Sequence, residues 1–210
     1  MKRILLFASA CCFAALPGFA QSRFGAFTGF VGGGISEPVS DIGRRLDNHG
    51  WNVTAGAGVS GKRVGLMLDF MFNQFSINRD TLNQVQAPDG TTRFWAFTLD
   101  PVIHVNRESP VDIYITGGGG IYHRTVEFTQ PALATVTAFD PWFGFYPVDV
   151  VTNQVIGSYG VYKGGVNGGA GIAFRLGSSR AKVFAEARYH HMFTERIDSS
   201  FIPVTFGIRW

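Results

Sequence analysis

Cysteine is almost missing from this sequence. Its 210 residues include only two cysteines, Cys11 and Cys12, and both lie in an N-terminal segment that has the pattern of a cleaved leader. The chain that follows this leader therefore has no thiol. This excludes a disulfide framework and thiol chemistry for the mature protein.

The leader is predicted from three features in a row. Lys2 and Arg3 come first, an apolar run follows over residues 4–16, and Pro17 then precedes the small residues Gly18 and Ala20. This order is typical of a signal peptide, which we place at residues 1–20, with one domain at 21–210. A membrane anchor helix is disfavoured, because it would need about 20 apolar residues and the run at 4–16 is shorter and is interrupted by Ser9. Lipoprotein processing is disfavoured because Ala8, Ser9 and Ala10 precede Cys11 without a leucine.

Charged residues are also scarce, at 16% of the chain, where soluble domains carry roughly 25%. Without Lys2 and Arg3, the 18 basic residues become 16 and stand against 15 acidic residues. Such a balance gives no basic surface for a nucleic acid, so no nucleic-acid partner is expected.

Long hydrophobic runs are absent after the leader, although 46% of the residues are hydrophobic and the chain holds 27 glycines and 20 phenylalanines. A membrane-spanning helix is therefore not predicted. A chain that is apolar outside without such runs is typical of a closed β-barrel, in which alternate residues of each strand face lipid.

Period-two alternation of apolar and polar residues marks the strands. Residues 51–60 place Trp51, Val53 and every second residue after them on one apolar face, and a turn at Gly61 leads into the same pattern at residues 64–73. Two such strands around a glycine turn predict a hairpin. Counted in this way the chain has eight strands, at 24–34, 51–60, 64–73, 94–105, 111–122, 166–176, 182–190 and 202–210.

The connections alternate in length. Those near Gly61, Glu108 and Ser178 are short, whereas those at 35–50, 76–91 and 125–158 are long and that at 194–200 is intermediate. Short turns on one side and long loops on the other are typical of outer-membrane barrels. The sequence therefore predicts an all-β, eight-stranded, antiparallel up-and-down transmembrane barrel with short periplasmic turns and long extracellular loops.

The last strand carries the clearest family feature. Its apolar row is Ile202, Val204, Phe206, Ile208 and Trp210. With this ending and the alternating loops, the mature chain resembles the OmpA-like, OmpX-like and opacity-type eight-stranded barrels of Gram-negative bacteria, whose last strand ends on an aromatic residue, usually Phe. The resemblance implies a location in the cell outer membrane, and it implies that this strand is read by the barrel-assembly machinery. It further implies contact with outer-membrane lipid and lipopolysaccharide, and a monomer.

The predicted inner face carries charges of both signs. An eight-stranded barrel is just wide enough for side chains to fill it, and buried charges need partners. We expect Asp112 to lie near Arg175 at the end of the barrel that carries the short turns. Arg188 is expected to face Asp69 and Asp100 across the lumen. The complete predicted lumen network is Asp69, Asp100, Asp112, Arg175, Glu186, Arg188 and Arg209, with Lys182 on the same face. A structural plug is favoured over a proton relay or a gated ion path.

A catalytic site is not predicted. The stretch EARYHHMF loosely resembles lipid A deacylase barrels, in which a serine follows two residues after a histidine, but Met192 and Phe193 stand at those places after His190 and His191. The two histidines are neighbours on one strand and so point to opposite faces, which disfavours a shared metal. No cofactor or metal site is expected.

The glycine stretches 117–120 and 164–169 lack the lysine and helix of a phosphate loop. Glycines in these strands are interpreted as bulges, as bends, or as room for large inward side chains such as Tyr114 and Tyr122. The aromatic segment at 139–147 is interpreted as a membrane girdle or loop packing, in preference to a ligand site. The function favoured is that of a structural or surface-interaction barrel without enzymatic activity. No motif identifies its surface ligand. The alternatives are a narrow OmpW-like channel for small hydrophobic molecules, a lipid A-modifying enzyme, and a soluble lipocalin-like barrel.

Overall fold

The computed structural model describes residues 26–106, 109–177, 179–195 and 197–210. The expected signal peptide at 1–20 and the first two residues of the expected first strand lie outside these ranges.

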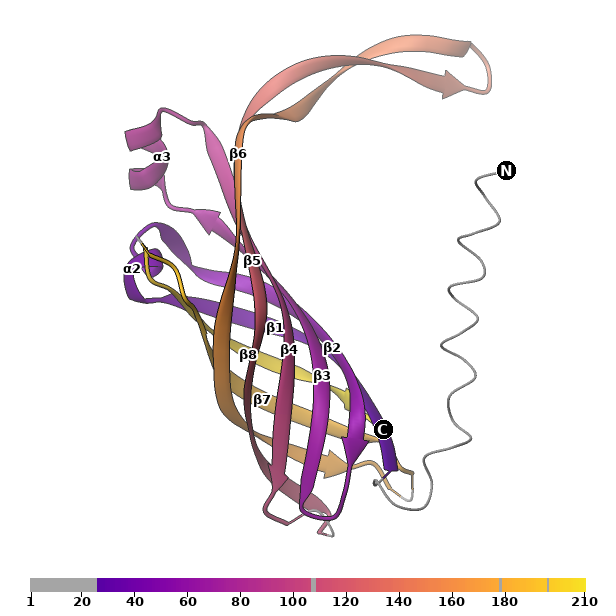
Figure 1. The fold of residues 1–210 in the computed structure, drawn as a ribbon. Coiled ribbons are helices and arrows are strands. Elements are labelled where there is room, and N and C mark those ends of the chain that lie inside the picture. The colour runs from indigo at the N-terminus through magenta and orange to yellow at the C-terminus, as the bar shows by residue number, and fades with distance from the viewer. Residues whose placement is uncertain (1–25, 107–108, 178, 196) are drawn as a thin grey trace, which may run out of the picture.

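Eight antiparallel strands form a closed barrel, as predicted (Figure 1). Each strand pairs with the next along the chain, and the last pairs with the first, so the up-and-down order is confirmed. The strands are β1 (Ala26–Val39), β2 (Leu46–Ser60), β3 (Val64–Ile77), β4 (Asp89–His104), β5 (Val111–Asp140), β6 (Gly144–Arg175), β7 (Lys182–Met192) and β8 (Ser199–Arg209).

Two short helices cover the end of the barrel that carries the long connections. Helix α2 (Ser40–Gly43) buries Ile42, and helix α3 (Arg79–Val85) buries Leu82. The Asn78 side chain caps α3 by accepting a hydrogen bond of 2.9 Å from the Thr81 amide, which satisfies one free amide of the first turn. No helix in the described ranges is long and apolar enough to cross a membrane.

The connection predicted as a long loop at 125–158 is instead a hairpin of two very long strands. Beyond the Asp89–Thr129 pair β5 leaves β4, and beyond the Gly165–Met192 pair β6 leaves β7. From there to the turn at 141–143, β5 and β6 pair only with each other and project from the barrel (Figure 1). We call residues 130–164 the ribbon.

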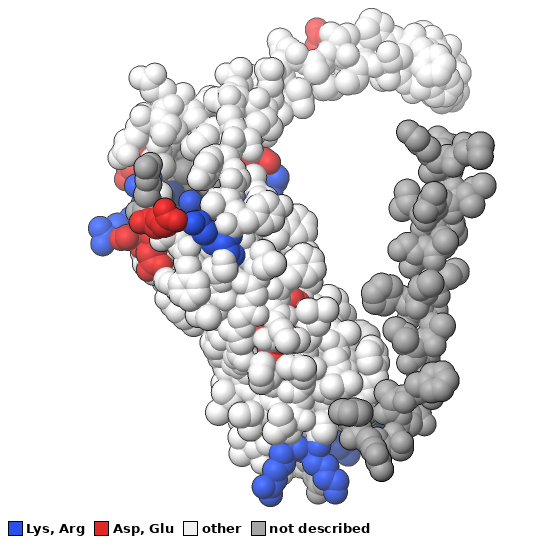
Figure 2. Space-filling view, in the orientation of Figure 1, with Lys and Arg blue, Asp and Glu red and all other residues white. Residues whose placement is uncertain are grey.

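The alternation along each strand separates a polar lumen from an apolar outside, as the sequence indicated. In β3, Leu66 and Leu68 are 41% and 60% exposed, whereas Met67 and Asp69, which alternate with them, are buried. Few charged side chains are visible at the waist of the barrel. Most of the charged side chains in this view lie toward its two ends (Figure 2). An outward row of ring side chains crosses four neighbouring strands because register aligns its members: Phe72 with Trp95, Trp95 with His123, and His123 with Tyr162.

Two tyrosines fill the lumen where glycines leave room for them. A Cβ atom on Gly171 would collide with the Tyr114 ring, and one on Gly165 would collide with the Tyr122 ring. Both tyrosine side chains are completely buried. Of the three interpretations of the strand glycines, room for large inward side chains is the one that applies at Gly165 and Gly171.

Candidate functional site

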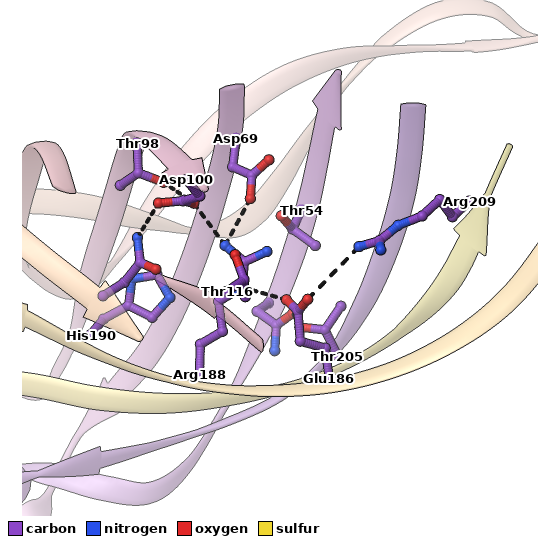
Figure 3. Close-up of polar contacts among 12 residues, drawn as sticks. Thr54, Asp69, Thr98, Asp100, Thr116, Glu186, Arg188, His190, Thr205 and Arg209 are labelled. Carbon is purple, nitrogen blue, oxygen red and sulfur yellow. Dashed lines mark hydrogen bonds and ion pairs between the residues drawn. The ribbon is translucent and has the colours of Figure 1, made fainter. Parts of the chain in front are cut away.

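The middle of the lumen is built around Arg188 of β7 (Figure 3). Its Nη1 donates to Asp69 Oδ2 of β3 at 2.7 Å and to Asp100 Oδ2 of β4 at 2.8 Å, and its Nε donates to Glu186. The side chains of Arg188, Asp69 and Glu186 are at most 4% exposed, and that of Asp100 is fully buried. The predicted meeting of Arg188 with Asp69 and Asp100 is confirmed.

Neutral groups complete the solvation of Asp100. Its carboxylate accepts hydrogen bonds from Thr98 Oγ1 at 2.7 Å and from Asn167 Nδ2 at 2.8 Å. These dipoles stabilise the carboxylate where water is excluded. The hydrogen bond from Asn167 joins β6 to β4, and strand β5 lies between these two strands in the barrel.

Arg209 of β8 joins this network toward the end with the short turns. Its Nη2 lies 3.9 Å from Glu186 Oε2, and its guanidinium lies 4.4 Å from the centre of the Tyr114 ring. The ring face stabilises the cation that the distant carboxylate only partly compensates. With Arg188 and Arg209 against Asp69, Asp100 and Glu186, the centre of the lumen holds two cations and three carboxyl groups.

The end with the short turns carries a second polar cluster. Asp112 accepts from Lys182 Nζ at 2.9 Å and lies 3.0 Å from His104 Nδ1, and the other His104 ring nitrogen lies 3.2 Å from the Ser60 hydroxyl. A cavity of about 60 Å³ beside these residues is too small for an organic ligand. The sequence placed Lys182 on this face but did not single out His104, although its inward parity was visible.

The predicted pair of Asp112 with Arg175 is wrong. Asp112 is opposite Ala173, and Arg175 lies beyond this pair at the end of β6, where it is exposed. Lys182, which register places beside Arg175, reaches inward to Asp112 in its place. Arg175 therefore sits at the rim in water and is not part of the lumen network.

The end with the long connections is closed by rings and apolar side chains. The Tyr122 hydroxyl lies 2.9 Å from His190 Nδ1, and the His190 ring stacks on Phe201 at 5.1 Å between centroids. Phe75 and Phe94 pack against the same phenylalanine. The predicted separation of the two histidines is confirmed, since His190 is buried in the lumen and His191 points to the outside.

A serine, a histidine and an acid meet at two places. Ser60, His104 and Asp112 make the contacts of a catalytic triad, with the serine and the acid on opposite ring nitrogens. However, Lys182 also binds Asp112, and the adjoining cavity of about 60 Å³ is too small for an organic substrate.

The other grouping of a serine, a histidine and an acid lies at the start of β8. His191 Nδ1 lies 2.9 Å from Ser200 Oγ and 3.2 Å from Asp198 Oδ1. In a catalytic triad the acid and the serine bind opposite nitrogens of the ring. Here both use Nδ1, and Ser200 is fully buried, so this geometry does not present a nucleophile to a substrate.

In the part of the chain that the structure describes, no three His, Cys, Asp or Glu side chains are placed to hold a metal ion. The carboxyl groups around Arg188 are already engaged by donors. The lumen network is therefore chemically a set of buried ion pairs.

The row predicted as the assembly signal forms the outward face of β8. Ile202 and Val204 are half-buried, whereas Phe206, Ile208 and Trp210 are exposed. Strand β8 closes the barrel against β1, and the backbone of Trp210 exchanges hydrogen bonds of 3.0 and 3.1 Å with Gly29. Recognition of this row by the assembly machinery stays a prediction.

Solved structures with a similar fold are outer-membrane barrels. Neisserial surface protein A superposes with a TM-score of 0.57 at 10% identity, over 90% of this chain and 98% of that one. A major outer membrane protein from Thermus thermophilus gives 0.53 at 11% identity, over 88% and 99%. The attachment invasion locus protein Ail of Yersinia pestis gives 0.50 at 18% identity, over 90% and 100%.

No protein-family model and no curated protein sequence matches the chain. At these identities the likeness establishes the fold, which is that of the small outer-membrane β-barrels.

Proposed function

We propose that the protein is an integral outer-membrane barrel that interacts with other molecules at the cell surface through its ribbon. We further propose that the barrel does not conduct ions. The observation that carries the membrane part is the reversed polarity of a closed barrel. Arg188, Asp69 and Asp100 are buried inside while Leu68, Phe97 and Ile115 are more than half exposed outside. A soluble barrel with apolar side chains in these outward positions would expose them to water, whereas lipid covers them.

The ribbon supports a role at the surface. In outer-membrane barrels the long connections face the exterior, and the ribbon is the longest one here. Among the described residues its two outer edges have no strand partner, and Trp142 and Phe143 at its tip are 86% and 87% exposed. Of the two interpretations of this aromatic segment, loop packing is not observed for these two rings, and the membrane girdle stays a prediction. Open strand edges and exposed aromatic rings are both means of binding another molecule.

The lumen supports a non-conducting barrel over the alternative of a narrow channel. The lumen is filled by Tyr114 and Tyr122 and by the cluster of Phe75, Phe94 and Phe201, all of which are fully or almost fully buried. The ion pairs of Arg188 occupy the space between them. The absence of enzymatic activity is part of the same proposal. It is supported by the buried position of Ser200 and by the small size of the cavity beside Ser60, His104 and Asp112.

Two measurements test this function. Unboiled protein from washed outer membranes should migrate differently on gels from boiled protein, because closed barrels resist detergent until heated. The purified barrel should give no discrete conductance steps in planar bilayers. A soluble periplasmic protein without the gel shift would contradict the membrane assignment, and regular conductance steps would favour the channel.

A further inference from the structure

A cavity opens at the barrel end that carries the long connections, beside the base of the ribbon. Its volume is about 450 Å³. The wall consists of Arg124 from β5, Tyr159, Val161 and Lys163 from β6, and Thr194, Glu195 and Ile197 from the β7–β8 connection. We call this cavity the vestibule. It lies apart from the ion pairs of Arg188, since Tyr122 and His190 close the lumen between them.

Arg124 is the unusual residue of the vestibule. Its side chain points to the inner face and the residue is only 8% exposed. Its Nη1 donates to the Ser199 hydroxyl at 2.7 Å, but its buried Nε has no hydrogen-bond partner. Within the described ranges no carboxylate forms an ion pair with it, in contrast to Arg188. A buried guanidinium without a counter-ion is destabilising unless an anion arrives from outside.

Lys163 adds a second cation on the same face. Register pairs Arg124 with Val161 and Tyr122 with Lys163, so the two basic residues are diagonal neighbours on β5 and β6. Lys163 Nζ donates to Glu195 at 2.6 Å, and the Glu195 side chain is 82% exposed on the connection after β7. That hydrogen bond lowers the pKa of the Glu195 carboxyl, so it is a charged and displaceable partner of Lys163.

The lining of the vestibule therefore holds two basic side chains, those of Arg124 and Lys163, against the one exposed carboxylate of Glu195. Arginine offers a planar fork of donors that matches phosphate oxygens, and lysine adds a point charge. The cavity volume is also within the range of small-molecule sites, and leaves room for a group attached to the phosphate.

We propose that the vestibule binds a phosphomonoester, with the phosphate between Arg124 and Lys163 and with Glu195 displaced from Lys163. The ester belongs either to a soluble sugar phosphate or to a phosphorylated sugar of an outer-leaflet lipid. The site itself follows from the cavity and its charges, and only its exposure to the cell exterior depends on the proposed function.

Titration calorimetry of the full mature barrel, refolded in uncharged detergent micelles, tests the site with glucose 1-phosphate, inorganic phosphate and glucose. We expect glucose 1-phosphate to bind and glucose not to bind. Arg124→Gln should weaken the binding at least tenfold, and Glu195→Gln should tighten it several-fold because a competing carboxylate is removed. Arg93→Gln is the matched control, since Arg93 lies outside the vestibule and pairs with Glu127 at 2.9 Å; its affinity should equal that of the wild type.

Mass spectrometry of lipids that co-purify with the protein from membranes distinguishes the two sources. A phosphorylated glycolipid that is retained by the wild type and lost from Arg124→Gln assigns the phosphate to a lipid. Binding of glucose 1-phosphate without a retained lipid assigns it to a soluble ester. Glu195 is exposed, so Glu195→Gln provides a test even where Arg124→Gln does not fold.

Two results would overturn the proposal. One is a folded wild-type barrel that binds neither glucose 1-phosphate nor inorganic phosphate and retains no phosphorylated lipid. The other is binding that Arg124→Gln leaves unchanged. A wild-type protein that shows no gel shift on heating would instead contradict the proposed function, so the two failures are distinguishable.

Discussion

Arg188 and Asp69 are 119 residues apart in the sequence, and their side chains meet across the lumen at 2.7 Å. Strand β7 carries the arginine and strand β3 the aspartate, which are not neighbours in the barrel. This contact therefore joins opposite parts of the wall through its interior. It exists only when all the strands between them are in register.

Replacing Arg188 with alanine should destabilise the barrel. The change leaves Asp69, Asp100 and Glu186 buried without their shared cation, and breaking a buried ion pair in this way costs about 3–5 kcal/mol. Urea unfolding in lipid vesicles, followed by tryptophan fluorescence, measures the difference. Arg175→Ala is the control, because Arg175 is exposed at the rim and its loss should change the free energy of unfolding by less than about 0.5 kcal/mol. Equal unfolding curves for Arg188→Ala and the wild type would contradict the structural role.

Deleting Trp210 should lower the amount of folded protein in the outer membrane. The backbone of Trp210 completes the ladder to Gly29, and its carbonyl oxygen accepts a hydrogen bond of 2.7 Å from Thr28 Oγ1. The deletion removes these contacts at the seam between β8 and β1, together with the last residue of the predicted assembly signal. The heat-modifiable fraction in membrane extracts measures the effect, and Trp210→Phe should retain it. Unchanged surface levels of the truncated protein would count against both roles.

The sequence predicted the lumen contacts because two simple rules apply to it. Period-two alternation determines which face a residue occupies, and the distance from a short turn determines its height. Asp69 and Arg188 obey both rules well inside their strands. Arg175 obeys the first rule but lies at a strand end, where the barrel wall no longer excludes water. Parity alone does not distinguish a lumen residue from one at the rim.

The ribbon could not be predicted for a different physical reason. Pro131 and Pro147 read as loop residues, because proline does not donate to a strand ladder. In the ribbon each strand has a partner on one side only. A backbone N–H on the open side makes no ladder hydrogen bond, so proline, which has no N–H, is tolerated there. Arg124 was missed as well, because nothing in its local pattern distinguishes a buried cation without a partner from one that is paired.

Gly171→Ala should destabilise the barrel through a clash with one ring. A Cβ at this position would overlap the buried Tyr114 side chain, and overpacking of this kind costs about 1–3 kcal/mol. Gly168→Ala on the same strand is the control, since a Cβ there would meet no atom within 4 Å. In a double-mutant cycle with Tyr114→Leu, the cost of Gly171→Ala should fall. A cost that is unchanged in the Tyr114→Leu background would show that the ring is not its cause.

Shortening the ribbon should leave the barrel intact. Pro131 pairs with Asn153, so residues 131–153 are replaced by Asn-Gly, the dipeptide that best closes a two-residue hairpin. The removed residues pair only with each other, and their loss should change neither the heat-dependent gel shift nor the urea midpoint. The contrast is Leu82→Ala in α3, which empties a buried position and should cost about 2 kcal/mol or more. A shortened protein that no longer folds would mean that the ribbon guides barrel assembly. A folded one shows that the exposed rings of Trp142 and Phe143 are not needed for stability, which leaves contact with another molecule as the reason for a projecting apolar tip.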